Sequence, residues 1–201
     1  MKYFILLMIL TNIVHAKTCN YEYTVWNAHK RMSTKTIKVN KNYKDINPSE
    51  MDQLGCTPCE VDQINIKLIN NLEFTICKKI ASKVKTTLNK LIANNYKIES
   101  IVGQRAQMSK GLLNKYGERT ELSNHSFGTA LDINEKMNGL YTNCIEFNDR
   151  CILLKGGRYH PNFGINANDE LVSELKKIGL IWGGEIKGKQ KDFMHFSLTG
   201  Y

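Results

Sequence analysis

The stretch SNHSFGTALDIN, Ser123 to Asn134, decides the fold of this 201-residue chain. It places His125 ahead of Asp132, with Gly128 between them. From Thr129 onward, apolar and polar residues alternate, which predicts a short strand with the Asp132 side chain on one face. Gly128 is able to take the sharp turn that would bring the His125 imidazole beside this carboxylate. A helix would also place these two positions on one face, so the spacing alone leaves both conformations open.

The later stretch KDFMHF, residues 191–196, repeats the combination of histidine and aspartate. We expect a strand over Asp192 to Leu198, in which alternate apolar residues form a core face and His195 points the other way. Asp192 lies where a polar loop meets this strand, so its carboxylate can turn toward the histidine. Two imidazoles and one carboxylate, with a fourth position left to water, form a recurring ligand set of catalytic zinc. The two stretches therefore predict a Zn²⁺ site made by His125, Asp132 and His195.

Hydrolysis at such an ion needs two further groups. A base must take the proton of the attacking water without binding the metal, and Asp192 is suitably placed for this role. A fixed cation should stabilise the charge on the attacked carbonyl oxygen, and Arg105, in the stretch VGQR, is the candidate. Against this interpretation, an isolated His–Asp pair is usually an ordinary hydrogen bond. His29 and His160 have no carboxylate motif around them, and we expect them to be surface or loop residues.

Residues 1–16, MKYFILLMILTNIVHA, combine one lysine, an apolar run and a small residue at the end. This composition is typical of a secretory signal peptide and too short for a spanning helix, although a retained anchor is the alternative. We therefore expect an exported protein, periplasmic, extracellular or associated with the cell wall, with no stable membrane span after cleavage. The formal net charge of +9 favours cell-wall polymers or anionic lipid surfaces as partners, and we expect no nucleic-acid partner.

Six cysteines in an exported chain favour disulfides, because their number is even and the compartment is oxidising. Cys144 and Cys151 flank a short polar segment, and they are the pair that we expect first. The stretch CTPC, Cys56 to Cys59, resembles a redox or zinc motif, but it has neither a thioredoxin-like setting nor a second CxxC. We therefore expect a structural bridge at this stretch.

The length and the hydrophobic pattern predict one compact α+β unit. Steps of three and four residues from Phe74 to Leu91 predict the clearest helix, and a second helix is expected from Asn168 to Ile178. Residues 17–55 are predicted to be an irregular polar lead-in, whose best strand candidate is Tyr21 to Trp26. The expected fold is a small antiparallel sheet that carries the zinc site and packs against the helices. We expect a monomer.

The same residues resemble the signature of a known family. SNHSFGTALDIN is similar to the S-x-H-x-x-G-x-A-x-D-x-N motif of the zinc D-alanyl-D-alanine carboxypeptidases of the VanY type, and WGGEIKGKQKDFMHF resembles their closing W-G-G…D-x-M-H-F motif. GQR, residues 103–105, is similar to the G-x-R that carries their arginine. The resemblance spans residues 56–201, which we expect to form the carboxypeptidase-like domain. It implies the fold that hedgehog domains and DD-peptidases share.

The resemblance also implies a role for each site residue. Zinc would be held by His125, Asp132 and His195. Asp192 would be the general base, Arg105 would steady the scissile carbonyl and bind substrate, and Ser123 would contact the end of the substrate. The implied enzyme hydrolyses peptidoglycan stem peptides, and the D-alanyl-D-alanine bond is the first candidate.

Three alternatives to this function stay open, and the last of them is an exported hydrolase of some amide outside the cell wall, which would share the whole site. The first is an L-Ala–D-Glu endopeptidase of the same fold, which would use the same site residues. The second is a non-catalytic cell-wall-binding protein that zinc stabilises. The presence of a candidate base and of an arginine argues against the second alternative.

Overall fold

The computed structural model describes residues 17–201, and the predicted signal peptide at 1–16 lies outside them. The described part of the chain has an α+β architecture with mostly small antiparallel sheets and two α-helices. The helices are α1 (Lys78–Ala93) and α2 (Glu170–Lys177). The strands are β1 (Thr18–Asn27), β2 (Met32–Asn42), β3 (Gln63–Lys67), β4 (Glu73–Cys77), β5 (Ile101–Val102), β6 (Gln107–Leu113), β7 (Arg119–Leu122), β8 (Ala130–Ile133), β9 (Leu140–Thr142), β10 (Ile152–Lys155), β11 (Ile181–Trp182), β12 (Gln190–Asp192) and β13 (His195–Ser197).

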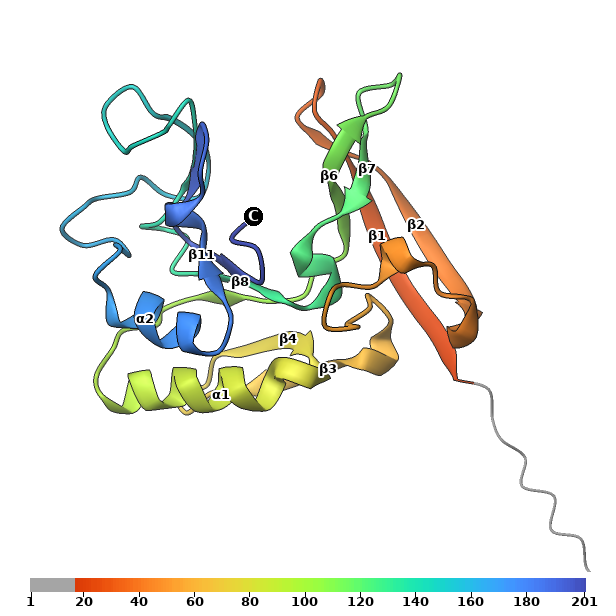
Figure 1. Cartoon of the computed structure of the whole chain (residues 1–201), viewed down its shortest axis with the longest axis horizontal. Coiled ribbons are helices and arrows are strands. Elements are labelled where there is room, and N and C mark those ends of the chain that lie inside the picture. Colours follow the sequence, from red (N-terminus) through yellow and green to blue (C-terminus); the bar gives the residue numbers. More distant parts are fainter. Residues whose placement is uncertain (1–16) are drawn as a thin grey trace, which may run out of the picture.

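The sheet that carries the candidate site has the strand order β11-β13-β8-β5 and is antiparallel. Its two central strands are buried on both faces, and Leu131, Ile133 and Phe196 are completely inaccessible. Helix α2 packs beside β11, and α1 runs along β3 and β4 (Figure 1). Both helices turn their apolar faces into the same core as β8 and β13. The site therefore rests on a rigid base of packed side chains.

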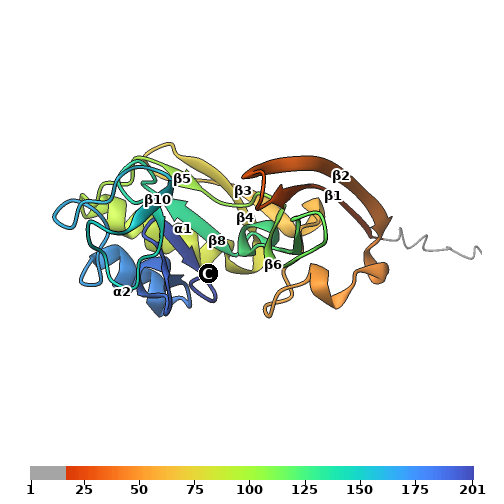
Figure 2. The same ribbon diagram turned by 90° about the horizontal axis from the view of Figure 1, so that it is seen from above.

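The sequence predicted an irregular segment over residues 17–55, and this prediction is wrong. The segment contains β1 and β2, the two longest strands of the described chain. Strands β1 and β2 form an antiparallel hairpin, and β1 continues into a sheet of order β2-β1-β6-β7. Figure 2 shows this hairpin at the opposite end of the molecule from α2. Strand β2 is an edge strand in which Lys35 and Lys38 are exposed, and only Ile37 and Val39 form an apolar alternation, which is too short to identify a strand of this length. Within residues 17–55, the sequence predicted one strand, at Tyr21 to Trp26, and it is confirmed as part of β1.

The predicted start of the first helix, at Phe74, is wrong by four residues, because α1 begins at Lys78. Phe74 and Cys77 belong to β4, which pairs with β3. Phe74 and Ile76 are buried on one face of β4, as the period of two in a strand requires. The apolar residues of α1 follow directly, so the sequence pattern does not show where the strand ends and the helix begins. From Ile80 onward the helical prediction is confirmed, and α1 buries one apolar stripe against the core.

The predicted closing strand, Asp192 to Leu198, is divided between two sheets. Asp192 ends β12, in the sheet β10-β9-β12, whereas His195 begins β13, in the sheet with β8. Phe193 and Met194 form the turn between them and are both buried. This break is the reason why Asp192 and His195 can approach one centre from different sheets.

Three disulfides tie the described chain together, and they join Cys19 to Cys59, Cys56 to Cys77, and Cys144 to Cys151. The expected Cys144–Cys151 pair is confirmed. The cysteines of CTPC are structural, as expected, but each has a partner in a different strand. Among the described residues, none of the helices has the length and apolar character needed to cross a membrane.

The disulfides are expected to contribute unequally to stability, because a longer closed loop removes more entropy from the unfolded chain. The Cys19–Cys59 bridge joins residues 40 apart, whereas Cys144–Cys151 joins residues 7 apart. We expect the double alanine variant of the first pair to lose about 4 kcal/mol of unfolding free energy and that of the second about 2.5 kcal/mol. Guanidinium unfolding of the two variants measures this difference, and the reverse order would contradict it.

Candidate metal centre

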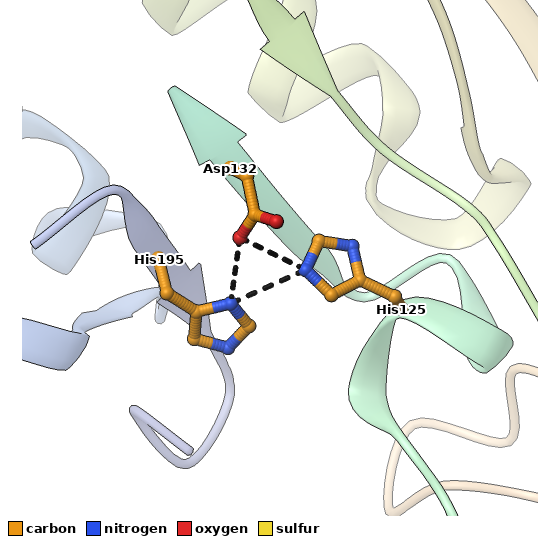
Figure 3. A group of neighbouring side chains, drawn as sticks. All are labelled: His125, Asp132 and His195. Carbon is orange, nitrogen blue, oxygen red and sulfur yellow. Dashed lines mark hydrogen bonds and ion pairs between the residues drawn. The ribbon is translucent and has the colours of Figure 1, made fainter. Parts of the chain in front are cut away.

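Three buried side chains, two from the stretch 123–134 and one from β13, meet at one point (Figure 3). His125 Nε2 lies 3.0 Å from Asp132 Oδ1 and 3.2 Å from His195 Nδ1. The third side of the triangle, from His195 Nδ1 to Asp132 Oδ1, measures 3.0 Å. The residues that the sequence predicted as metal ligands are therefore brought together.

His125 is positioned by a short turn rather than by a strand. It lies in a 3₁₀ helix, Asn124–Phe127, which ends at Gly128 in the left-handed conformation with φ of 67°. A side chain at Gly128 would collide with the backbone of Cys77, so the expected role of this glycine in the turn is confirmed. His125 Nδ1 donates a hydrogen bond to the Gly103 carbonyl oxygen at 2.7 Å. This bond leaves the lone pair of Nε2 facing the other two side chains.

Asp132 and His195 face each other because of strand register. They are directly opposite in the antiparallel pair of β8 and β13, so their side chains lie on the same face of the sheet. A slip of one residue would turn one of them away from the other. The short strands are held in register by Phe196, which is opposite Leu131 in the core.

The donor set fits a divalent cation. Burial lowers the pKa of His125, so its imidazole is neutral at pH 7. Burial alone would raise the pKa of Asp132, but His125 and His195 outweigh it and hold this pKa well below its usual value. His125 Nε2 and Asp132 Oδ1 are then two acceptors only 3.0 Å apart, a contact that a cation between them would make favourable. Tetrahedral zinc with bonds of about 2.0–2.1 Å would space its ligand atoms about 3.3 Å apart, close to the triangle observed.

Asp192 lies beside this triangle without belonging to it. Its Oδ1 is buried and has no hydrogen-bond partner among the described residues. Burial raises the pKa of Asp192 to about 6. A β-carbon at Gly183 would lie 3.1 Å from the Asp192 β-carbon and 3.2 Å from that of His195, so both side chains leave the backbone next to this glycine. The structure thus brings Asp192 to the ligand set, as the sequence predicted, and leaves one carboxylate oxygen available for a proton.

Arg105 also reaches the centre, but through Asp132. Its Nη2 donates to Asp132 Oδ2 at 2.8 Å, on the oxygen that does not face the histidines. Arg105 Nε is buried without a partner among the described residues, and the side chain is 38% exposed. The arginine therefore orients the Asp132 carboxylate and keeps donor groups at the edge of the site.

Residues 117–198 match the family model described as D-alanyl-D-alanine carboxypeptidase. This part of the chain, which is less than half of it, is similar to that family. The comparisons with curated proteins and with solved structures found no significant match. The family match supports a metallopeptidase, and it covers the three converging residues and Asp192 but begins after Arg105.

Ser123 is a predicted site residue that no hydrogen bond among the described residues joins to the three converging side chains. It is buried, and its hydroxyl lies 3.2 Å from that of Ser126. Ser126 in turn bonds both backbone groups of Gln107, so the serine pair holds the turn that carries His125.

Sequence reasoning missed two groups at the centre. The Gly103 carbonyl orients His125, and the stretch GQR was considered only for its arginine. Lys155 Nζ lies 3.7 Å from Asp132 Oδ2, and no motif around Lys155 indicates this position. Both groups arrive through pairing between distant segments, which leaves no periodic signal in the sequence.

Proposed function

We propose that this protein is an exported, zinc-dependent peptidase that hydrolyses peptidoglycan stem peptides, most specifically a D-alanyl-D-alanine carboxypeptidase. The observation that carries the proposal is the separation of roles at the centre. Three atoms that can bind a metal ion converge on one point, and a second carboxylate, Asp192, stands beside them with a buried, unpartnered oxygen. The family match and the α+β architecture support the hedgehog/DD-peptidase arrangement of the fold.

The proposed mechanism assigns one task to each residue. His125, Asp132 and His195 would hold zinc, which supplies Lewis-acid chemistry when it is bound. Asp192 accepts a proton from the attacking water as the bond to the carbonyl carbon forms, and it returns this proton to the nitrogen as the C–N bond breaks. Arg105 fixes the orientation of Asp132 and offers donors to the carbonyl oxygen on which negative charge develops. Ser123 is proposed to contact the end of the substrate.

The disulfides and the net charge both support the proposal that the protein is exported. Three disulfides in the described chain favour an oxidising compartment. The net charge of +9 suits substrates that carry several carboxylates. These features favour a protein that works at the cell wall, and we propose that it acts there as a monomer.

The non-catalytic alternative is disfavoured by Asp192. Burying a carboxylate oxygen without a hydrogen-bond partner costs free energy, and a zinc site that only stabilises a fold has no need of it. The endopeptidase alternative would use the same side chains and would differ only in the peptide that the site accepts.

Purified mature protein, incubated with defined muropeptides with and without a chelator, tests the proposal by mass spectrometry of the products. We expect loss of the terminal D-Ala, abolition of this activity by the chelator, and recovery when Zn²⁺ is added. A cut after L-Ala would move the protein to the endopeptidases. Absence of both products, with stoichiometric zinc still bound, would contradict an enzymatic function.

A further inference from the structure

A second cation, Lys155, reaches the metal centre from the far end of β10. Its Nζ lies 3.7 Å from Asp132 Oδ2, the same oxygen to which Arg105 donates at 2.8 Å. Asp132 is only 2% exposed, whereas the Lys155 side chain is 48% exposed. Because Arg105 already satisfies this oxygen at a shorter distance, Lys155 has a charge that is still available to a ligand arriving from solvent.

The position of Lys155 follows from an irregularity in strand pairing. Leu153 is opposite Tyr141, and regular pairing would place Leu154 opposite Leu140, but the register shifts and Lys155 takes that position. Such a bulge redirects the side chains that follow it. Leu140 is in turn opposite Asp192 on the other side of β9. Lys155 and Asp192 are therefore in one row across three strands and on the same face of this sheet.

The opposite face of the sheet β10-β9-β12 packs against an aromatic cluster. Tyr141, in the neighbouring row, packs edge-on against Phe147 of the Cys144–Cys151 loop and against Phe193. This aromatic cluster supports the sheet from behind, so the disulfide loop stiffens the strands that carry Lys155 and Asp192.

The backbone after Lys155 is held tightly by two glycines. Gly157 N donates to the Glu135 carbonyl oxygen at 2.8 Å, and a β-carbon at Gly157 would lie 1.6 Å from the Lys136 carbonyl oxygen. A β-carbon at Gly156 would approach the Glu135 carbonyl oxygen to 2.9 Å. Lys155 is consequently presented from a packed strand end, where a directed contact loses less entropy than it would on a free loop.

The charges at the centre leave room for an anion. Arg105 and Lys155 balance Asp132 and Asp192, so a divalent cation at the three ligands would leave the centre positive. A substrate carboxylate beside Lys155 would reduce this positive charge. Lysine acts as a compact point charge and needs no planar, bidentate partner, so a single carboxylate oxygen is sufficient for it.

We propose that Lys155 binds the carboxylate carried by the carbon atom attached to the scissile amide nitrogen, and so restricts the enzyme to amides that bear this group. The inference rests on the proposed peptidase function and specifies its substrate class. The free carboxylate of a terminal D-Ala occupies this position, and so does the free α-carboxylate of a D-Glu that is linked through its side chain. The proposal therefore applies to either candidate bond.

The test compares peptides that have this carboxylate free with the same peptides as carboxamides, in a D-Ala-D-Ala series and in an L-Ala–D-Glu series. We expect the wild type to prefer the free acid and the Lys155→Gln variant to lose about 10- to 100-fold of this preference, because one charged hydrogen bond is removed. The loss should appear in KM with kcat little changed. Lys155→Arg should retain most of the preference, and Lys136→Gln, which removes an exposed lysine nearby, should leave it unchanged.

A binding measurement separates this inference from the proposed function. Calorimetry with the zinc-loaded Asp192→Asn protein gives dissociation constants for acid and amide with and without Lys155→Gln, and zinc content is determined for each sample. Equal weakening of acid and amide, or lost zinc with unchanged discrimination, would overturn the inference and make Lys155 a partner of Asp132 alone. If the wild type cleaves neither series while Lys155 still discriminates acid from amide in binding, the proposed function fails and the carboxylate site stands.

Discussion

An Asp192→Asn variant is expected to keep its zinc and to lose turnover by about 100- to 10,000-fold, the usual contribution of a general base. Asn has the same shape but cannot accept the proton that the attacking water must lose. Asp192 is not one of the three converging side chains that we propose as ligands, so metal content should be unaffected. Steady-state kinetics on the muropeptide that the wild type cleaves, together with metal analysis of the same samples, measures both quantities.

The matched control is Asp45→Asn, which removes one carboxylate from an exposed position in the 3₁₀ helix Tyr43–Asp45. It should behave as the wild type in both measurements. Activity that persists in Asp192→Asn would show that another group takes the proton, whereas loss of zinc would place Asp192 among the ligands.

The same variant has a second readout that does not depend on catalysis. Burial raises the pKa of Asp192 to about 6, above its usual value, so ionisation of this group opposes folding. The folded protein freed of metal is therefore expected to lose stability as the pH rises from about 4 through 6, and this loss should be absent in Asp192→Asn. Unfolding curves at pH 4 and pH 8 would show the difference between the two proteins growing with pH, and a constant difference would contradict the assignment.

Replacement of His195 with Ala is expected to lower zinc affinity by at least about 100-fold, because even loss of a group that only orients a ligand costs about 10- to 100-fold. Two of the three proposed ligands, Asp132 and His125, would remain, and we expect them alone to bind zinc only weakly. The variant should lose its metal during dialysis against a chelator that the wild type resists. Metal analysis after this dialysis measures the effect, and activity should be lost in parallel.

His160→Ala is the control for this experiment, because His160 is an exposed loop residue whose ring is tilted against that of Phe163. It should retain the zinc of the wild type. Circular dichroism of both variants establishes that the fold persists without the ion. Unchanged zinc stoichiometry in His195→Ala would remove this histidine from the ligand set.

The strands that carry the centre could be predicted from the sequence because their signals are local. Alternation around Asp132 identified β8, and Gly128 indicated the turn that the structure contains. The predicted secondary structure was wrong where the local pattern fits two kinds of element or contains too few apolar residues. The apolar run through Phe74 fits both a strand and a helix, and the edge strand β2 has hardly any apolar pattern.

The sequence by itself determined which side chains are able to form the centre, because His125, Asp132, Asp192 and His195 are recognisable from residue type and short-range spacing. Only the tertiary structure decided how they are oriented. The Gly103 carbonyl selects the tautomer of His125, Arg105 takes the outer oxygen of Asp132, and a shifted register between β9 and β10 brings in Lys155. These contacts join segments that are far apart in the chain, and they depend on strand register and close packing, which no local pattern of residues encodes.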